Sequence, residues 1–329
     1  MISWICKLSF FKKVVIILFI IIYPILFFEY KIFPYQKIKF LKNNHIDFYL
    51  KHKFYIKEAS KCINQKNYFK NENKNVYSFF IAGHTYGTPN KKNLGLYKDF
   101  YKIIKKNSGY DFGILAGDFV QEANKAPIPM VGALNESWNA VDKQIDKIGY
   151  KIYLVAGNHD FDKINGLYEK RYGKSYYYFK YQKDLFIILN STQNHLNIVN
   201  DQLKFLKETI KKHKFNNLYI ISHHMIWMFN KELFNSNEDE RLNFTSNYLP
   251  KNFKTNFWHD IAPVLLELKK NVYLISGNIG QFPRQRSIYC KNYKNIKFLS
   301  TGMGGGKYDN FIVFKNNKKA KLKIDFKFF

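Results

Sequence analysis

Two stretches of the sequence decide the fold, DFGILAGDFV at residues 111–120 and KIYLVAGNHD at residues 151–160. In each, a short apolar run of the kind typical of a buried β-strand leads directly into a glycine and a polar cluster. Similar stretches are VYSFFIAGHTYG at 76–87, LYIISHHMIW at 218–227 and NVYLISGNIG at 271–280. The pattern predicts five buried strands, each with polar residues at its carboxyl end, where ligand groups gather in α/β sheets.

Helical patterns separate these strands. We predict helices at Leu94–Asn107, Trp138–Ile148, Asp201–Lys212 and Trp258–Lys270. Asp201 is expected to be the N-cap of the third helix. The apolar stripe of that helix consists of Leu203, Phe205, Leu206 and Ile210. Alternating strands and helices predict a layered α/β sandwich.

Residues 175–192, SYYYFKYQKDLFIILNST, contain two apolar runs separated only by Gln182–Asp184. So short a connection predicts two antiparallel strands. The sheets of the sandwich are therefore expected to be mixed.

The formal net charge of +28 is typical of proteins that bind nucleic acid. Nearly all of the positive charge comes from lysine, however, and arginine occurs at only four positions. Proteins that read bases favour arginine for its bidentate guanidinium, and these lysines are spread along the chain. We expect no specific nucleic-acid partner, and we favour attraction to anionic lipid or to an anionic substrate.

An uncharged run, VVIILFIIIYPILFF at residues 14–28, follows Lys12 and Lys13 near the N-terminus. As a helix it is roughly 22 Å long, which is short for a membrane, but residues 2–11 could lengthen it if the lysines snorkel. No small-residue cleavage site follows, which favours an uncleaved signal anchor over a removed signal peptide.

We therefore expect three segments: a membrane anchor helix at residues 1–30, a basic juxtamembrane linker at 31–75 and a globular domain at 76–329. The anchor would contact membrane lipid, and the chain would be a single-pass membrane protein. Such a leader usually places the following domain outside the cytoplasm, although lysines on both sides of the run hardly discriminate between the orientations.

The three cysteines, Cys6, Cys62 and Cys290, have no metal-binding spacing. Cys62 and Cys290 could pair in an oxidising compartment. Isolated thiols are the simpler interpretation.

The polar clusters at the strand ends have the composition of a metal site. Their residues are Asp118, Asn158, His159, His223, His224 and Asn278. Each alone has an ordinary explanation, such as a helix cap, a turn or a buried histidine. Together they match the carboxylate, imidazole and amide ligands that divalent cations use when they hydrolyse phosphoesters.

Gly117-Asp118 followed by Gly157-Asn158-His159-Asp160 resembles the GD and GNH(E/D) motifs of the calcineurin-like metallophosphoesterases. The strand pair at 175–192, the pair His223-His224 and STGMGGG at 300–306 are similar to further motifs of that family. The resemblance covers about residues 76–315.

The resemblance implies a four-layer αββα fold with a two-metal site. It implies that Asp118 bridges both metals and that Asn158 and His223 bind the second, with His224 as the alternate for His223. It also implies that His159 contacts phosphate and protonates the leaving group.

Two motifs depart from the family pattern. The D-x-H motif aligns with His84-Thr85-Tyr86, and the G-H-x-H motif aligns with residues 277–280. Of the first metal's usual ligands only Asp118 remains, so His84 is expected to replace the missing carboxylate, with Tyr86 as a further candidate. Asn278 would offer an amide oxygen to the second metal. One or two ions are expected, with Fe, Mn or Zn favoured over Mg because the ligands include imidazole.

Other residues carry weaker predictions. Arg284 and Arg286 follow the last motif and could bind the phosphate of a substrate, or could lie on the surface. Asp160 and Asp162 are expected to orient the turn that carries Asn158.

The sequence thus predicts metal-dependent hydrolysis of a phosphoester by metal-activated water at the membrane surface. The alternative is a catalytically impaired pseudophosphatase that acts as a membrane-anchored binding or scaffold protein. A basic nucleic-acid binder or nuclease is a third and weaker hypothesis.

Overall fold

The structure is a computed structural model that describes residues 50–87, 94–107, 109–121, 131–161, 166–228, 254–281 and 285–329. The chain divides into two compact units, Met1–Phe54 and Tyr55–Phe329, and the second unit is described below. It begins earlier than the expected domain start at residue 76. The predicted anchor at residues 1–30 lies outside the described residues. Within the described part, no helix combines the length and the apolar character needed to cross a membrane.

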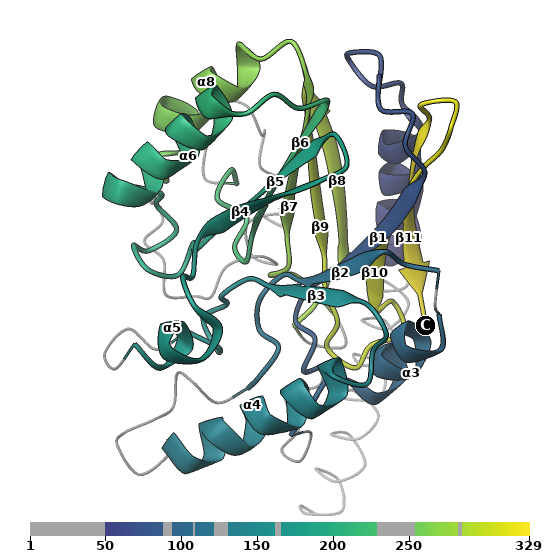
Figure 1. Ribbon diagram of the computed structural model, residues 1–329. Coiled ribbons are helices and arrows are strands. Elements are labelled where there is room, and N and C mark those ends of the chain that lie inside the picture. Colours follow the sequence, from purple (N-terminus) through teal and green to yellow (C-terminus); the bar gives the residue numbers. More distant parts are fainter. Residues whose placement is uncertain are drawn as a thin grey trace, which may run out of the picture. The chain divides into compact units, whose positions relative to one another are not determined.

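One sheet has the strand order β11-β10-β1-β2-β3 (Figure 1). Its strands are β1 (Tyr77–Ala82), β2 (Phe112–Leu115), β3 (Lys151–Leu154), β10 (Asn310–Asn316) and β11 (Leu322–Phe328). Strands β1, β2 and β3 are parallel, whereas β10 and β11 are antiparallel to their neighbours. This sheet is called sheet A.

The other sheet, sheet B, has the order β4-β5-β6-β7-β9-β8. Its strands are β4 (Tyr177–Tyr181), β5 (Asp184–Leu189), β6 (Asn217–Ser222), β7 (Asn271–Ser276), β8 (Ile288–Tyr293) and β9 (Ile296–Thr301). Strands β5, β6, β7 and β9 are parallel, and the two edge strands are antiparallel to them. The prediction of two mixed sheets, including the antiparallel pair within residues 175–192, is confirmed.

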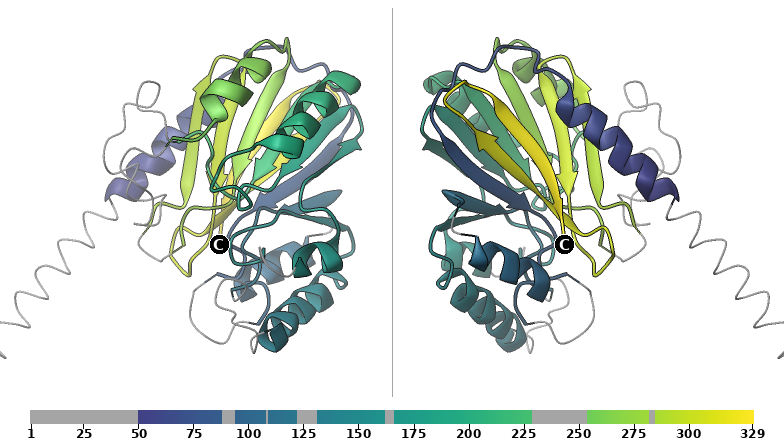
Figure 2. Two further views of the ribbon diagram at one scale, coloured as in Figure 1. Left: turned by 90° about the vertical axis from the view of Figure 1, so that its left-hand side faces the viewer. Right: turned by 90° about the vertical axis from the view of Figure 1, so that its right-hand side faces the viewer.

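The helices cover the outer faces of the two sheets (Figures 1 and 2). They are α3 (Lys98–Lys106), α4 (Val131–Ile145), α5 (Leu167–Tyr172), α6 (Asn200–Lys212), η3 (Phe257–Ile261) and α8 (Ala262–Leu266). Apolar side chains join α3, α4 and α5 to sheet A, and others join α6 and α8 to sheet B. A third core lies between the sheets. These three cores separate four layers, in the order helices, sheet, sheet, helices.

Alternation along the strands explains the three cores. In β1, Phe79 and Ile81 face the inter-sheet core, whereas Phe80 and Ala82 face α3 and α4. Because side chains alternate between the faces of a strand and both faces are buried, the strands read as continuous apolar runs.

Two helix predictions need correction. Asp201 is not the N-cap of α6, because the helix begins at Asn200 and the capping position is Val199. The helix predicted at Trp258–Lys270 is shorter, a π-helical turn followed by α8, which ends at Leu266. The predicted apolar stripe of α6 does pack against sheet B.

The preference for isolated thiols was wrong at two of the three cysteines. Cys62 and Cys290 form a disulfide with a Cα–Cα distance of 5.8 Å. It joins the helical residues 55–64 to β8. Residues 69–75 also pair with the sheets, since Asn71 donates to Asn316 at 3.0 Å. Part of the predicted linker therefore packs within the second unit.

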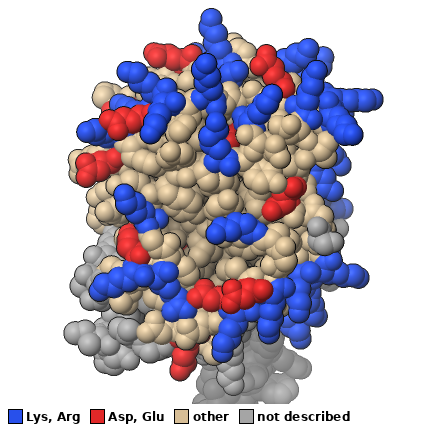
Figure 3. Space-filling view, in the orientation of Figure 1, with Lys and Arg blue, Asp and Glu red and all other residues tan. Residues whose placement is uncertain are grey.

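Lysine and arginine are scattered over the face of the molecule that Figure 3 shows, with acidic residues among them. On this face they form no single stripe along which a nucleic-acid backbone would run.

Candidate metal centre

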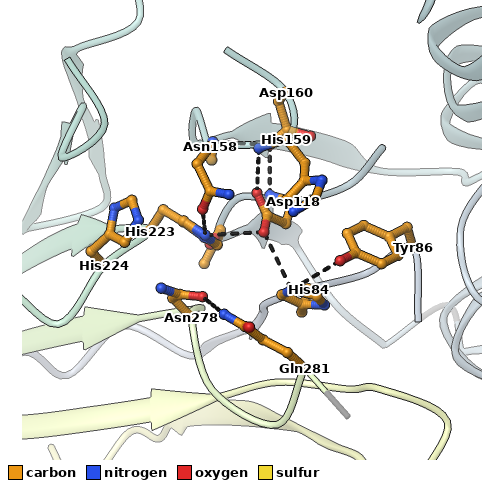
Figure 4. A network of polar contacts seen from close by, with 12 residues as sticks. His84, Tyr86, Asp118, Asn158, His159, Asp160, His223, His224, Asn278 and Gln281 are labelled. Carbon is orange, nitrogen blue, oxygen red and sulfur yellow. Dashed lines mark hydrogen bonds and ion pairs between the residues drawn. The ribbon is translucent and has the colours of Figure 1, made fainter. Parts of the chain in front are cut away.

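The polar residues that follow the parallel strands lie together at one end of both sheets (Figure 4). His84 follows β1, Asp118 follows β2, and Asn158 and His159 follow β3. His223 follows β6 of the other sheet. The centre is therefore built from both sheets, at the carboxyl ends where the sequence predicts it.

Asp118 is the central residue of this group. Its carboxylate oxygen Oδ2 lies 3.2 Å from Nε2 of His223 and 3.3 Å from Nε2 of His84. Its other oxygen, Oδ1, accepts a hydrogen bond of 2.9 Å from the backbone N–H of His159. Asp118 is fully buried, and no donor hydrogen within the described residues is aligned with Oδ2.

The hydrogen bond of the His223 ring shows which of its nitrogens is protonated and which faces Asp118 Oδ2. Nδ1 lies 3.0 Å from the carbonyl oxygen of Ala116, which is an acceptor, so Nδ1 carries the proton. Nε2 of the neutral ring then presents a lone pair to two oxygens, Asp118 Oδ2 and, at 3.1 Å, Asn158 Oδ1. Three electron-rich atoms facing one another require either a second proton on His223 or a cation among them.

Burial and charge oppose each other in the pKa values of this group. Burial disfavours the Asp118 carboxylate, but the charges of His223 and His159 hold its pKa well below its usual range. Burial also disfavours the His223 imidazolium, yet Asp118 raises the pKa of that ring. For His84 burial dominates and lowers the pKa. Asp118 is thus an anion, and His84 is a neutral imidazole that can act as a ligand.

Tyr86 lies beside His84, with its hydroxyl 3.2 Å from Nε2 of that ring. Burial and the charge of Asp118 raise the pKa of Tyr86 above the ordinary range of a phenol. Without a nearby cation the side chain is therefore a phenol and not a phenolate.

Asp160 fixes the turns that carry these residues. Its carboxylate accepts hydrogen bonds from the backbone N–H groups of four residues, at 2.6 to 2.9 Å. The donors are Asp118, Phe119, Val120 and Gly157. Asp160 therefore ties the turn after β2 to the turn after β3, as the sequence predicts. Asp162 lies outside the described residues.

Comparison with known proteins adds to this geometry. The family model described as calcineurin-like phosphoesterase matches residues 84–260, more than half of the chain. The chain belongs to the calcineurin-like phosphoesterases. No curated protein sequence is matched.

Solved structures show weaker likenesses. A dimetal phosphatase from Danio rerio is 12% identical with a TM-score of 0.49, covering 74% of this chain and 93% of that one. Vacuolar protein sorting 29 from Cryptosporidium parvum is 8% identical with a TM-score of 0.32, covering 77% of this chain and 98% of that one. Only the sequence match shows the family, because these scores are low.

The distances around Asp118 fit a cation within this phosphoesterase. Two donor atoms that each lie about 2.1 Å from one ion, at roughly 90–110° to each other, are about 3.0–3.4 Å apart. Asp118 Oδ2 lies 3.2 Å from His223 Nε2 and 3.3 Å from His84 Nε2, and His223 Nε2 lies 3.1 Å from Asn158 Oδ1. Within the described residues, no group of three or more His, Cys, Asp or Glu side chains could by their placement hold a metal ion. Neutral amide oxygens would therefore have to complete the ligand set.

The altered last motif leaves no room for a side chain at Gly280. A Cβ at Gly280 would lie 2.8 Å from Cβ of Ser287, and the backbone there has φ of 69°. Asn278 faces the centre in Figure 4, but its Oδ1 accepts a hydrogen bond from Gln281 Nε2. The phosphoesterase thus has one dense cluster of donors around Asp118, to which residues 277–280 add no imidazole.

Of the two arginines in the sequence prediction, Arg284 lies outside the described residues. Arg286 is buried, donates to the carbonyl oxygen of Ile288 at 2.8 Å and lies over the ring of Tyr55 at 4.1 Å. Arg286 is therefore part of the packing and does not lie on the surface.

His224 differs from His223 in its partners. Its Nδ1 lies 2.9 Å from Ser191 Oγ, and its backbone N–H donates to the same oxygen at 2.9 Å. Nε2 of His223, in contrast, lies 3.2 Å from Asp118 Oδ2. The geometry therefore favours His223 over its alternate as the residue that faces Asp118.

Three supporting residues were missed in the sequence. The carbonyl oxygen of Gln121 lies 2.6 Å from His159 Nδ1, and Ser276 Oγ donates to the carbonyl oxygen of His223 at 2.6 Å. Ser191 holds His224. Ser191 and Ser276 lie at the ends of β5 and β7, so the strand-end rule used above could have found both.

Proposed function

We propose that this protein hydrolyses a phosphoester with the help of a divalent cation held at Asp118. The supporting observation is the buried oxygen Asp118 Oδ2, which has no aligned donor among the described residues and lies 3.2 and 3.3 Å from two imidazole nitrogens. A buried carboxylate oxygen without a partner is costly, and a cation among these donors would remove that cost.

Four side chains would hold the cation: Asp118 through Oδ2, His223 and His84 through Nε2, and Asn158 through Oδ1. When bound, a divalent cation supplies a Lewis acid for the phosphoryl oxygens and an activated water molecule. Imidazole ligands favour Fe, Mn or Zn over Mg. The crowded position at Gly280 supports one strongly bound ion, with Asn278 as a neutral contributor to any second.

His159 is placed to act on the substrate. Its Nδ1 donates to the carbonyl oxygen of Gln121, so its Nε2 remains for a phosphate oxygen or the leaving group. Its backbone N–H binds Asp118 Oδ1, which fixes the distance between the ring and the carboxylate. We assign to His159 phosphate contact and proton delivery to the leaving oxygen.

A pseudophosphatase is the second candidate, and the reduced last motif favours it. Gly280 admits no side chain, and the amide of Asn278 is already engaged by Gln281. A chain with too few ligands for catalysis could still bind an ion or a partner with the same fold.

Activity and metal content together separate the two candidates. The full-length chain in detergent would be assayed on an aryl phosphate monoester and diester with Mn, Fe, Zn and Mg, and its metal would be counted by mass spectrometry. Hydrolysis that disappears in Asp118→Asn and His159→Gln, with bound metal lost only in the first, supports the enzyme. Bound metal without turnover of either ester supports the pseudophosphatase, and absence of both refutes a metal centre.

We further propose that residues 1–30 anchor the protein in a membrane and that the phosphoesterase domain lies outside the cytoplasm. The uncharged run at residues 14–28 and the disulfide Cys62–Cys290 support this proposal, because disulfides persist in oxidising compartments. Protease treatment of intact and of opened cells tests it. Cleavage of the domain only after the cells are opened would contradict the proposed topology.

A further inference from the structure

A second polar pocket lies at the opposite end of sheet B from the metal centre. It has a volume of about 210 Å³ and is lined by residues 65–68, 271–273 and 294–297, together with Asn292. These residues belong to the amino ends of β7 and β9, whereas the metal centre lies beyond their carboxyl ends. The two sites are about 20 Å apart along the strands, at roughly 3.3 Å per residue.

The pocket is basic and contains a buried ammonium group. Lys66, Lys294 and Lys297 line it, and none of its described lining residues is acidic. Lys297 is only 5% exposed. Within the described chain no carboxylate forms an ion pair with it, and its one hydrogen bond goes to the carbonyl oxygen of Cys62 at 2.9 Å.

The position of Lys297 explains why it is buried. In the sheet it is paired with Tyr273 on β7 and with Asn292 on β8, so these three side chains share one face. Tyr273 belongs to the inter-sheet core, which places the lysine on the inner face as well. The helical residues 55–64 lie over this side, because the Cys62 carbonyl accepts from both Lys297 and Asn292.

The carbonyl oxygen of Cys62, near the end of its helix, uses only one of the three N–H donors of Lys297. The Cys62 carbonyl is one of the last in its helix and needs a donor from outside the helix. A lysine has three N–H donors, however, and only one has a partner among the described residues. Burial lowers the pKa of Lys297 to about 8, so near neutral pH the group keeps its proton and its unbalanced charge.

Tyr273 adds a buried hydroxyl to the pocket, on a side chain that is 1% exposed. The side chain of Asn67 hydrogen-bonds to this hydroxyl, and the O–H of Tyr273 can still donate to a ligand. Buried polar groups are normally paired, so the unused donors of Lys297 indicate that an acceptor binds there. Because Lys297 carries a full positive charge, an anion satisfies the pocket better than water does.

We propose that this pocket binds a small oxyanion, phosphate or sulfate, that pairs with the ammonium group of Lys297 and accepts from the hydroxyl of Tyr273. Lys66 and Lys294 at the exposed rim add attraction for an anion. The volume suits a tetrahedral oxyanion with some water and is too small for a large ligand. The proposal is independent of the function assigned to the metal centre.

Thermal unfolding of the full-length chain tests the proposal. Phosphate, and separately sulfate, would be titrated in detergent at an ionic strength held constant with potassium chloride. We expect the unfolding midpoint of the wild type to rise by roughly 2–4 °C at ten times Kd. Asp118→Asn should show the same rise, because the oxyanion binds away from the metal centre.

Lys297→Met should lose the rise, because it removes the charge while keeping a side chain of similar length. Lys102→Met is the matched control, since Lys102 lies on α3 and is 63% exposed, and it should respond as the wild type does. If Lys297→Met fails to fold, Tyr273→Phe replaces it and should weaken apparent phosphate affinity about five-fold. A wild type that ignores both anions at constant ionic strength overturns the proposal. An undiminished response in Lys297→Met or in Tyr273→Phe overturns it equally.

Discussion

Gly277 lies where three strand ends meet. The substitution Gly277→Ala tests whether the metal centre depends on the close approach of these ends. A Cβ at this position would lie 2.0 Å from the carbonyl oxygen of Ala116 and 2.8 Å from Cα of Gly83. Both are main-chain atoms, so neither can rotate away as a side chain would. A carbon and a carbonyl oxygen approach one another to roughly 3.3 Å at closest. Gly277→Ala must therefore separate the ends of β7 and β2 by more than about 1 Å.

That displacement has a cost in stability and a cost in metal binding. Overpacking a core typically costs about 1–3 kcal/mol, and a clash between main chains belongs at the upper end, so we expect about 3 kcal/mol. The hydrogen bond of 3.1 Å from the N–H of Gly277 to the carbonyl oxygen of His223 would also be strained. Because His223 would move relative to Asp118, affinity for Zn or Mn should fall at least about ten-fold, as it does when groups that orient ligands are altered.

Urea denaturation and competition with a chelating dye measure the two effects on the full-length chain. Gly149→Ala is the matched control, because its added methyl group has no neighbour within 4 Å. It should be neutral or slightly stabilising, by up to about 1 kcal/mol. The reasoning is refuted if Gly277→Ala is as stable as Gly149→Ala and holds metal as tightly.

Three further predictions concern other parts of the molecule. His223→Ala should weaken metal binding by about 100-fold or more, and His224→Ala should not; calorimetric titration with Zn compares them, and equal losses would refute the assignment. Replacing Cys62 and Cys290, 228 residues apart, by serine should cost up to about 5 kcal/mol in urea, whereas an unchanged midpoint under reducing conditions would contradict this. Because the pKa of Lys297 is about 8 in the folded chain and 10.5 in the unfolded one, unfolding takes up a proton between these values. Stability should therefore rise with pH there, by up to about 3 kcal/mol relative to Lys297→Met, and parallel pH profiles of the two proteins would exclude the effect.

The sequence predicts the interior strands and the residues of the candidate centre, because burial of a strand on both faces produces an apolar run that ends at the first polar residues. A strand buried on two faces must be apolar throughout, so β1, β2, β6 and β7 stand out as runs, and the first polar residues after each run lie at the end of the sheet. The edge strand β11 lacks this signal. In β11, Lys323, Asp325 and Lys327 interrupt the apolar residues, and no separate strand was predicted there.

Features that depend on the approach of distant segments could not be predicted. The disulfide joins residues 228 positions apart, and no local pattern distinguishes its cysteines from free thiols. Asp201 suggests itself as the N-cap of α6 because Asp is a common capping residue, whereas in this fold the cap, Val199, lies two positions earlier. Burial of Lys297 follows only from the position of residues 55–64, which were taken for linker.

The placement of the candidate ligands has a consequence for stability as well as for chemistry. Asp118, Asn158 and His84 belong to sheet A, whereas His223 belongs to sheet B. A cation held by Asp118 and His223 would therefore join the two sheets at the carboxyl ends of their parallel strands. Near the amino ends the contacts of Lys297, and further along β8 the disulfide, fasten residues 55–64 to sheet B. Because a ligand that binds only the folded chain stabilises it, loss of the cation should loosen the junction of the sheets first and leave the disulfide-bonded end intact.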